Sequence, residues 1–205
     1  MLNGYYQLFS ELPGGDYEIC VAFLKKELAA ALEGAYHEEF DNADIRHFND
    51  TARRLYTLYF DRTEDYESTD FYSRAARVVF VFGQSAPATG LRNHKRMRQW
   101  LGAFRDQPEY IGYDKGHYIA HCNDGQVDQN LYPQLRELNR GISPQGKLYR
   151  SMERYLAQNP GVFYFVRPLY NDLTWIPDRI DFGIFTKEKG LLLNRFDNKI
   201  PKSSL

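Results

Sequence analysis

The stretch Gly112-Tyr-Asp-Lys-Gly-His-Tyr-Ile-Ala-His121 places an acidic residue, a lysine, a glycine and a histidine in succession at positions 114 to 117. Glycine reaches backbone conformations that other residues avoid, so this order predicts a tight turn that presents the imidazole of His117. The same order also suits an ordinary surface turn. The residues that follow must therefore decide between a simple turn and a functional site.

Two amide-bearing segments and a glutamate follow this histidine. The segments are Asn130-Leu-Tyr-Pro-Gln134 and Leu138-Asn139-Arg140-Gly141. Glu153 lies within residues 144–158, which Ser143 as N-cap and Pro144 as first helical residue predict to be a helix. Amide oxygens together with water suit Mg²⁺, which retains much of its hydration shell. The histidine is then left to act as a base.

At these residues the chain resembles the DNA/RNA non-specific endonucleases of the ββα-metal type. Their signature is Asp-Arg-Gly-His, then Asn-x-x-Pro-Gln, then Leu-Asn-x-Gly, then a glutamate on a helix. Residues 114–117 match the first element with lysine in place of arginine, and the two asparagines keep the family's nine-residue interval. The match covers residues 111–172, and the joint occurrence of its elements is far more specific than any one of them.

The resemblance implies a role for each matching residue. His117 would be the general base that activates a water, Asn139 the one direct protein ligand of Mg²⁺, and Glu153 the holder of a metal-bound water. Asn130 would orient groups in the site. The other expected catalytic residues are Asp114, Lys115, Arg150 and Arg154. The two arginines would either stabilise the transition-state phosphate or lie in solvent. Mn²⁺ is the expected substitute for Mg²⁺, and the products would carry 5′-phosphates.

The chain departs from the family pattern in two places. Lys115 keeps the positive charge but lacks the planar fork with which arginine grips phosphate at two points. The interval from Asn139 to Glu153 is longer than in the best-known members, through residues 142–147. The alternative for Glu153 is a structural ion pair with Arg150, one helical turn earlier. The face of this helix expected to meet the core comprises Leu148, Met152, Tyr155 and Leu156.

The order of elements predicts an α+β fold: a ββα-metal nuclease core with an antiparallel sheet and an N-terminal helical segment. Residues 1–70 are expected to form an acidic helical segment, with helices over 17–33, ended by Gly34, and over 44–60. Residues 71–205 are expected to form the nuclease core. Its elements are a buried strand over 78–82, helices over 91–105 and 144–158, and strands near 162–167, 180–186 and 190–195.

The net charge of −1 conceals an asymmetry between these parts. Residues 1–70 hold fifteen acidic and six basic side chains, whereas residues 71–205 hold twelve acidic and twenty basic ones. The basic part favours a nucleic-acid partner, and the acidic part would shield or regulate the basic part. Two alternatives stay open: the charges form unrelated solvated faces, or the first 70 residues complete the core and their deletion unfolds the protein.

Basic side chains also concentrate on the helix expected over residues 91–105. Together with Arg140, its Arg92, Lys95, Arg96 and Arg98 are the candidates to hold a phosphate backbone. The alternative is that these residues form the solvated face of an ordinary amphipathic helix. Contacts to phosphate carry no sequence information, so base identity would matter little for cleavage.

Bulk composition narrows the class of protein further. Hydrophobic residues make up 43% of the chain and charged residues 26%, which excludes a disordered protein. Cys20 and Cys122 cannot form a disulfide framework and lack zinc-binding spacing. The chain shows no secretory signal and no membrane-spanning stretch. We expect cytoplasmic synthesis and no membrane partner, with signal-independent secretion left open.

Three interpretations of function follow. The first is a Mg²⁺-dependent endonuclease that cleaves DNA and/or RNA without sequence preference, serving as an antibacterial toxin or effector, or in defence. An inhibitor or immunity protein would then accompany it. The second is a catalytically inactive nucleic-acid-binding protein, and the third is a toxin-like interaction protein whose acidic segment binds a partner. The first is favoured because every expected ligand residue is present.

Overall fold

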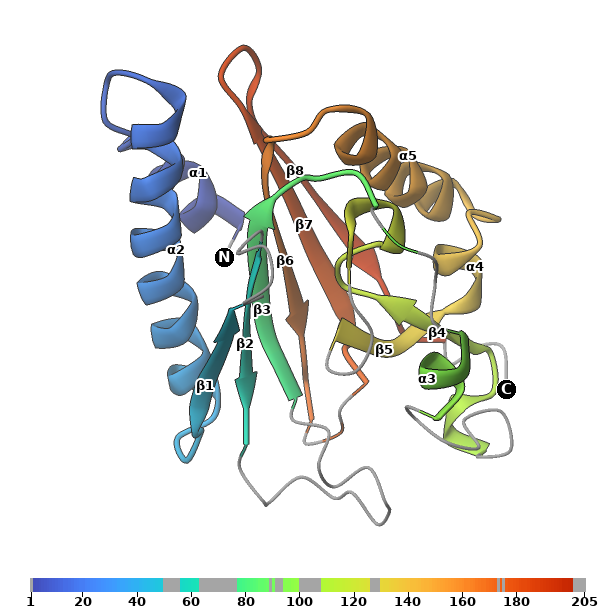
Figure 1. The fold of residues 1–205 in the computed structure, drawn as a ribbon. Helices are drawn as coiled ribbons and strands as arrows, with labels where there is room; N and C mark the ends of the chain where they lie inside the picture. Colours follow the sequence, from blue (N-terminus) through green and yellow to red (C-terminus); the bar gives the residue numbers. More distant parts are fainter. Residues whose placement is uncertain are drawn as a thin grey trace.

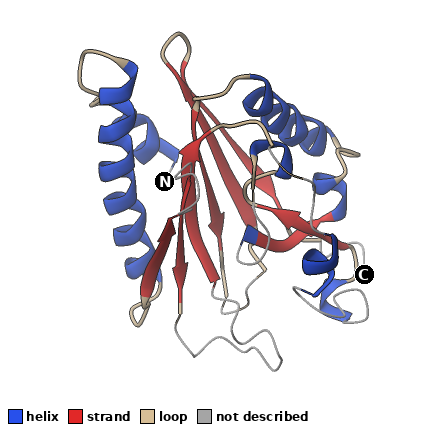
Figure 2. Ribbon diagram, viewed as in Figure 1, coloured by secondary structure: helices blue, strands red, loops and turns tan. Residues whose placement is uncertain are grey.

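The structure is a computed structural model that describes residues 2–49, 56–62, 77–88, 90, 94–99, 108–125, 130–172, 174 and 176–200. A six-stranded antiparallel sheet forms its centre, in the order β1-β2-β3-β6-β7-β8 (Figure 2). The strands are β1 (Ile45–Asn49), β2 (Tyr56–Asp61), β3 (Arg77–Gln84), β6 (Phe163–Leu169), β7 (Arg179–Thr186) and β8 (Gly190–Asp197).

Helices α1 (Leu2–Ser10) and α2 (Tyr17–Glu39) cover one face of this sheet (Figure 1). Leu24 and Leu28 of α2 are fully buried in a core cluster that also contains Phe80 of β3. Alternate residues of a strand point to opposite faces, so Phe163 and Phe165 of β6 meet these helices whereas Tyr164 and Val166 meet the other layer.

The opposite face carries the segments that hold the sequence motifs (Figure 1). These are the hairpin β4 (Tyr113–His117) and β5 (Leu131–Leu135), then α4 (Arg136–Asn139) and α5 (Pro144–Gln158). Helix α5 buries Tyr149, Met152 and Leu156 against Phe182 and the rest of the sheet. The short elements α3 (His94–Gln99), η2 (Pro108–Tyr110) and η3 (His121–Asn123) connect these parts.

The helix expected over residues 44–60 is wrong, because its described residues form β1 and β2. The Tyr-Thr-Leu-Tyr-Phe run at 56–60 is rich in residues that favour strands. Tyr59 stacks on Phe80 of β3, with ring centroids 4.1 Å apart, so pairing with a distant strand outweighs the helical spacing. The apolar side chains then fill a sheet rather than a helix stripe.

Two smaller expectations also need correction. Helix α2 runs through Gly34 to Glu39, because a single glycine inside a long buried helix weakens it without ending it. On α5, Met152, Tyr155 and Leu156 pack in the core as expected, but Leu148 is 43% exposed and Tyr149 is buried in its place.

The remaining expected elements are confirmed where the structure describes them: α2, β3, α5 and the last three strands. Of the helix expected over 91–105, residues 94–99 are helical and the rest lies outside the described residues. The sheet crosses the expected boundary at residue 70, because β2 pairs with β3. Among the described residues of the range 1–70, α1 and α2 are the only helices.

Candidate active site

The site is assembled on the β4-β5 hairpin and the two helices that follow it. Strand register pairs His117, the last residue of β4, with Leu131, the first of β5. Asn139 ends α4, and Glu153 lies in the third turn of α5. The chain thus brings residues from three elements to one side of the main sheet (Figure 1).

Gly116 lies inside β4, so the expected tight turn before His117 is wrong. A Cβ atom at Gly116 would stand 2.2 Å from Oε1 and 2.4 Å from Cβ of Gln134, on the neighbouring strand. Both separations are far below van der Waals contact. Glycine is required because the Gln134 side chain lies across this backbone, and the first and second motif elements therefore pack against each other.

Asn130 fixes the loop that follows His117. Its Oδ1 accepts the backbone N–H of Ile119 at 2.8 Å, and its Nδ2 donates to the Ile119 carbonyl at 2.9 Å. The residue is only 2% exposed, so both bonds form away from solvent. His117, a residue that is 9% exposed, therefore stands at the end of a strand whose continuation is held at two points. Asn130, the residue expected to orient groups in the site, thus holds the backbone next to His117.

The same loop is joined to helix α5 by a residue that the sequence analysis did not identify. Asn123 donates from Nδ2 to the backbone carbonyl of Glu153 at 3.2 Å. Next to it, Asp124 adopts φ 61°, a left-handed conformation in which aspartate and asparagine are enriched among non-glycine residues. A Cβ at Gly125 would meet the carbonyl oxygen of Ile119 at 1.8 Å. The Asn-Asp-Gly triplet at 123–125 was the available signal for this tight loop.

Asp114 holds the side chain of Asn139 from the hairpin. Nδ2 of Asn139 donates to Oδ2 of Asp114 at 3.3 Å. Arg140 donates to the same carboxylate from Nε at 2.6 Å and from Nη2 at 2.9 Å, and Arg136 approaches at 3.5 Å. The amide nitrogen of Asn139 is thereby engaged, which leaves its Oδ1 as the acceptor available to a ligand.

These donors also keep Asp114 ionised. Partial burial would by itself raise the pKa of the Asp114 carboxyl. The hydrogen bonds from Arg140 and Asn139, with the charges of Arg140 and Arg136, outweigh burial and hold that pKa below its usual range. The carboxylate therefore remains negatively charged at neutral pH and keeps accepting from Asn139.

Arg150 links the two helical residues of the site. Its Nη1 donates to the backbone carbonyl of Asn139 at 3.2 Å, and its Nε lies 3.7 Å from Oε2 of Glu153. The structural pair considered for Glu153 and Arg150 is thus present. It also ties Glu153 to the residue expected to bind metal, so an ion-pair role and a site role are compatible.

The longer interval before Glu153 is absorbed by a compact turn between α4 and α5. Gly141 adopts φ 68°, and the hydroxyl of Ser143 accepts the backbone N–H of Gly146 at 3.0 Å as an N-cap. A Cβ at Gly146 would meet the Glu137 carbonyl at 2.3 Å. The two helices therefore approach closely, and the extra residues do not carry Glu153 away from α4.

Lys115 connects the hairpin to the basic helix α3. Its Nζ donates to the backbone carbonyls of Met97 at 3.3 Å and Arg98 at 3.1 Å. A cation at the C-terminal end of a helix is favourable because the last carbonyls there lack partners within the helix. Lys95 and Arg98 are exposed on this docked helix, as the prediction for nucleic-acid contacts requires.

The other expected basic residues differ in exposure and in their contacts. Arg140 is half exposed but engaged with Asp114, and Arg154 is exposed on α5. Arg92 and the side chain of Arg96 lie outside the described residues. No group of three or more histidine, cysteine, aspartate or glutamate side chains suited to a metal occurs within the described part of the chain.

Three buried polar residues of the hairpin and α5 were not among the predicted site residues. They are Tyr132 and Gln134 of β5 and Tyr149 of α5, each 1% exposed. The charge of Glu153 acts on both tyrosine hydroxyls. Gln134 was part of a motif, but tyrosines in an aromatic-rich chain give no sequence signal that separates them from ordinary core residues.

The chain is similar to known nucleases. A family model described as "DNA/RNA non-specific endonuclease" matches residues 56–189, more than half of the chain. Similar solved structures include an "extracellular endonuclease", with 16% identity and a TM-score of 0.44 over 78% of this chain and 92% of that one. For "Sda1 nuclease with bound zinc ion" the identity is 13% and the TM-score 0.48, over 80% and 87% of the two chains. For "NucA from Streptococcus agalactiae with magnesium ion bound" the identity is 18% and the TM-score 0.38, over 78% of this chain and 74% of that one. No curated protein matches.

Proposed function

Because the chain belongs to the DNA/RNA non-specific endonuclease family and is therefore a hydrolase of phosphodiester bonds, we propose that it is a Mg²⁺-dependent endonuclease without sequence preference. The family match confirms the resemblance inferred from the motifs. The observation that supports the proposal most directly is the orientation of Asn139, whose amide nitrogen is held by Asp114 at 3.3 Å. An asparagine held in this way presents its oxygen as a ready ligand.

The donor set fits a hydrated hard cation. Asn139 offers one neutral oxygen, and Glu153, whose side chain is 16% exposed, offers a carboxylate on the adjoining helix. With no larger group of metal-binding side chains among the described residues, water must fill most coordination positions. Mg²⁺ retains its waters in this manner, whereas a structural zinc site needs four protein ligands. When bound, the metal would neutralise charge that develops on the phosphate oxygens.

His117 is the proposed general base. Attack on phosphorus needs a deprotonated water, and a positioned histidine contributes roughly 10²- to 10⁴-fold to such a step. Its imidazole stands at the end of β4, and Asn130 fixes the chain that follows through two bonds to Ile119. This support lets the ring receive a proton without a change in the backbone.

Basic side chains around the site are proposed to hold the nucleic-acid backbone. Arg150 and Arg154 are exposed on α5, and Lys95 and Arg98 are exposed on α3. Lys115 contributes by docking α3 against the hairpin, because its ammonium group is engaged with the helix carbonyls. All these groups recognise phosphate rather than bases, which supports cleavage without sequence preference.

The wider biological setting remains a prediction of the sequence. Use as an antibacterial effector or in defence, an inhibitor or immunity protein, and signal-independent export are proposals that presuppose nuclease activity. Among the described residues, no helix is both long and apolar enough to cross a bilayer.

A cleavage assay with controlled metal tests the proposal. Supercoiled plasmid and RNA are incubated with the purified protein in Mg²⁺, in Mn²⁺ and in EDTA, alongside Asn139→Ala. We expect nicking and RNA degradation with Mg²⁺ or Mn²⁺, none in EDTA, and a much greater Mg²⁺ requirement or no activity for Asn139→Ala. Undiminished cleavage in EDTA would reject metal dependence. Tight nucleic-acid binding without cleavage would favour the inactive binding protein.

A further inference from the structure

A cavity of about 330 Å³ lies at the end of the main sheet, where β6 ends and β7 begins. Leu169, Arg179 and Arg195 line it from three neighbouring strands, and Glu39 lines it from the last turn of α2. The alternation of side chains along the strands places the three strand residues on the face that α1 and α2 cover, opposite to the β4-β5 hairpin. Cavities that hold small molecules typically measure about 300 to 1,000 Å³. This cavity is therefore large enough for a small ligand and lies apart from the candidate active site.

Arg179 brings an unused positive charge to the cavity. Asp197 lies opposite it in the strand register, but Asp197 accepts a hydrogen bond from Nε2 of Gln145 at 3.0 Å. Asp178 precedes it in the chain, but Asp178 is paired with Lys199 at 2.7 Å. Within the described residues, the Arg179 guanidinium makes no hydrogen bond or ion pair. The residue is half-buried and lines the cavity, so its N–H donors are available to a ligand there.

The carboxylates on this part of the sheet face are already paired with other arginines. Asp181 accepts hydrogen bonds from Arg195 at 2.6 and 2.8 Å. Glu39 lies 4.0 Å from the Nη2 atom of Arg167, whose side chain is almost fully buried. Three arginines therefore stand against two carboxylates, and Arg179 supplies the surplus. A surplus of positive charge in a recess of the surface attracts anions.

The rest of the cavity wall is apolar and consists of Phe40, Leu169 and Tyr170. The guanidinium carbon of Arg77 lies 3.7 Å from the ring centroid of Tyr170 and 4.6 Å from that of Phe40. Because Arg77 is only 1% exposed, it supports the two rings from the protein interior. The wall suits an apolar group of a ligand better than a second charge.

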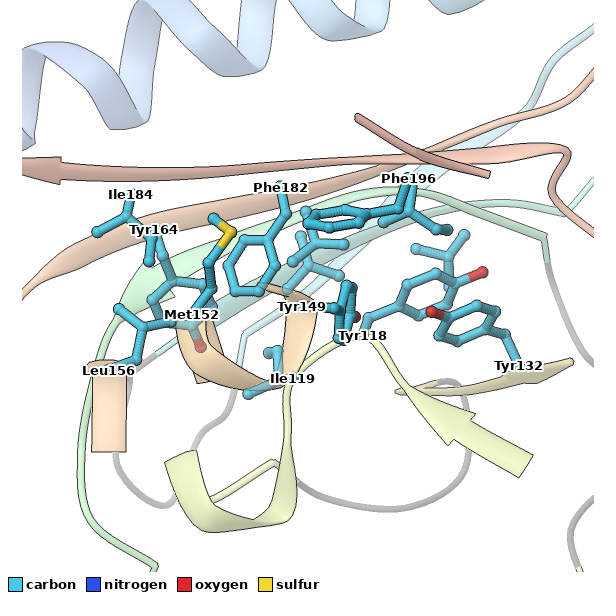
Figure 3. Packing of buried hydrophobic residues seen from close by; sticks show 14 of the residues in the cluster. Tyr118, Ile119, Tyr132, Tyr149, Met152, Leu156, Tyr164, Phe182, Ile184 and Phe196 are labelled. Carbon is cyan, nitrogen blue, oxygen red and sulfur yellow. The ribbon is translucent and has the colours of Figure 1, made fainter. Parts of the chain in front are cut away.

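Tyr170 is also fixed by its hydroxyl group. The hydroxyl donates to the backbone carbonyl of Val78 at 2.9 Å and lies 3.3 Å from the hydroxyl of Tyr118. Tyr118 stacks on Tyr132 in the core cluster, with ring centroids 4.1 Å apart (Figure 3). The cavity wall is thus anchored to the core on the other side of the sheet. A wall that is already in place lowers the entropic cost of binding a ligand.

We propose that this cavity binds a small organic anion, with a phosphate or carboxylate group on Arg179 and an apolar ring against Phe40 and Leu169. Arginine suits this role because its planar guanidinium donates two parallel hydrogen bonds to either group. Glu39 would repel a second anionic group, so the site favours a ligand with one. The site goes beyond the proposed function, because none of its lining residues belongs to the candidate active site.

Four probes that differ in one feature each test this inference on the full-length protein in EDTA. Phenyl phosphate and benzoate carry the two anionic groups on a ring, benzyl alcohol lacks the charge, and inorganic phosphate lacks the ring. In calorimetric titrations we expect one saturable site for phenyl phosphate or benzoate, with a Kd of about 1 mM or lower. Benzyl alcohol and inorganic phosphate should each bind about tenfold more weakly, because each lacks one of the two contacts. The tighter of the two aromatic anions identifies the anionic group that Arg179 prefers. Equal binding of benzyl alcohol, or no saturable binding of either aromatic anion, would overturn the inference.

Two variants and a control locate the bound anion. Arg179→Gln removes the charge and keeps a polar side chain, and Arg179→Ala removes both. In each variant the affinity for the aromatic anion should fall about tenfold or more, while circular dichroism shows an intact fold. Arg154→Ala is the matched control, because Arg154 is exposed on α5, on the other side of the sheet, and its affinity should stay within about twofold of wild type.

Amide signals in nuclear magnetic resonance spectra provide an independent location. The signals of residues 169–171, which line the cavity, should shift as the aromatic anion is added. Wild-type affinity in both Arg179 variants, or an equal loss in Arg154→Ala, would reject this site. Because binding is measured in EDTA and needs no cleavage, a negative result here leaves the proposed nuclease function standing, and an inactive protein that binds the anion leaves this inference standing.

Discussion

Asp114 on strand β4 accepts the side-chain N–H of Asn139, at the end of helix α4, over 3.3 Å. Arg140 engages both oxygens of the same carboxylate at 2.6 and 2.9 Å, so Asp114 itself is held in place. A residue of the first motif element therefore sets the side-chain orientation of a residue in the third. The joint presence of these elements has a direct structural reason, since each needs the other for its geometry.

Loss of this contact should weaken metal use. In Asp114→Ala, the Asn139 amide is free to rotate and its oxygen is no longer presented. The Mg²⁺ concentration for half-maximal cleavage should rise about 10- to 100-fold, as for other residues that support metal ligands. Arg140→Ala, which keeps the Asp114–Asn139 contact, should have a smaller effect. Equal Mg²⁺ titration curves for wild type and Asp114→Ala would contradict this account.

The low pKa of Asp114 predicts a pH dependence of stability. A carboxyl whose folded-state pKa lies below its unfolded value, about 3.9, stabilises the protein above that value. The contribution is lost as pH falls through the folded-state pKa. Wild type should therefore have a higher Tm than Asp114→Asn near pH 7, and the difference should shrink below about pH 4. Thermal unfolding of both proteins across pH checks this, and a constant difference down to pH 2 would be inconsistent with it.

Gly116→Ala should destabilise the hairpin. The added methyl group meets Gln134 at 2.2 Å, and overpacking of this kind typically costs about 1–3 kcal/mol. Gly34→Ala is the matched control, because a Cβ there has nothing within 4 Å and helix propensity favours alanine by about 1 kcal/mol. Urea unfolding should show opposite signs for the two variants. Combining Gly116→Ala with Gln134→Gly should cost less than the sum of the single changes, and strict additivity would disprove the packing explanation.

His117→Ala should abolish detectable cleavage while leaving the fold intact. Loss of a general base costs roughly 10²- to 10⁴-fold in rate. His37→Ala is a suitable control, since His37 is exposed on α2, the helix on the other face of the sheet. Circular dichroism and degradation of plasmid and RNA compare the variants. Cleavage at the wild-type rate by His117→Ala would remove the basis for its assignment as the base.

A chain that begins at Phe71 should fail to fold. Deleting residues 1–70 removes α1 together with α2, the helix that contributes the fully buried Leu24 and Leu28, and it exposes the edge of β3. Loss of a core layer and of two strands favours a structural role for this acidic part over simple shielding of the basic part. Limited proteolysis and circular dichroism decide the matter. A folded product that cleaves faster than the full chain at low salt would instead support shielding.

Much of the site was predictable because its signals are local or repeat at fixed intervals. Ser143 and Pro144 mark the start of α5, and the β-branched and aromatic run at 78–82 marks β3. The spacing of Asn130 and Asn139 identified the family, which the family match confirms. Such signals depend on the residue types themselves and on neighbours within a turn or two. The amino-acid sequence alone is therefore sufficient to predict these elements.

The tertiary structure decided whatever depends on contacts between distant residues. Residues 45–49 and 56–61 are strands because they pair, directly or through a neighbour, with β3, and Gly116 is needed because Gln134 approaches it from another strand. The clamp of Asp114 on Asn139 likewise arises only after the hairpin packs against α4. The sequence thus determined which chemical groups the protein has and its local helices. Long-range pairing and burial determined how those groups face one another, because such energies depend on neighbours that local residue order does not specify.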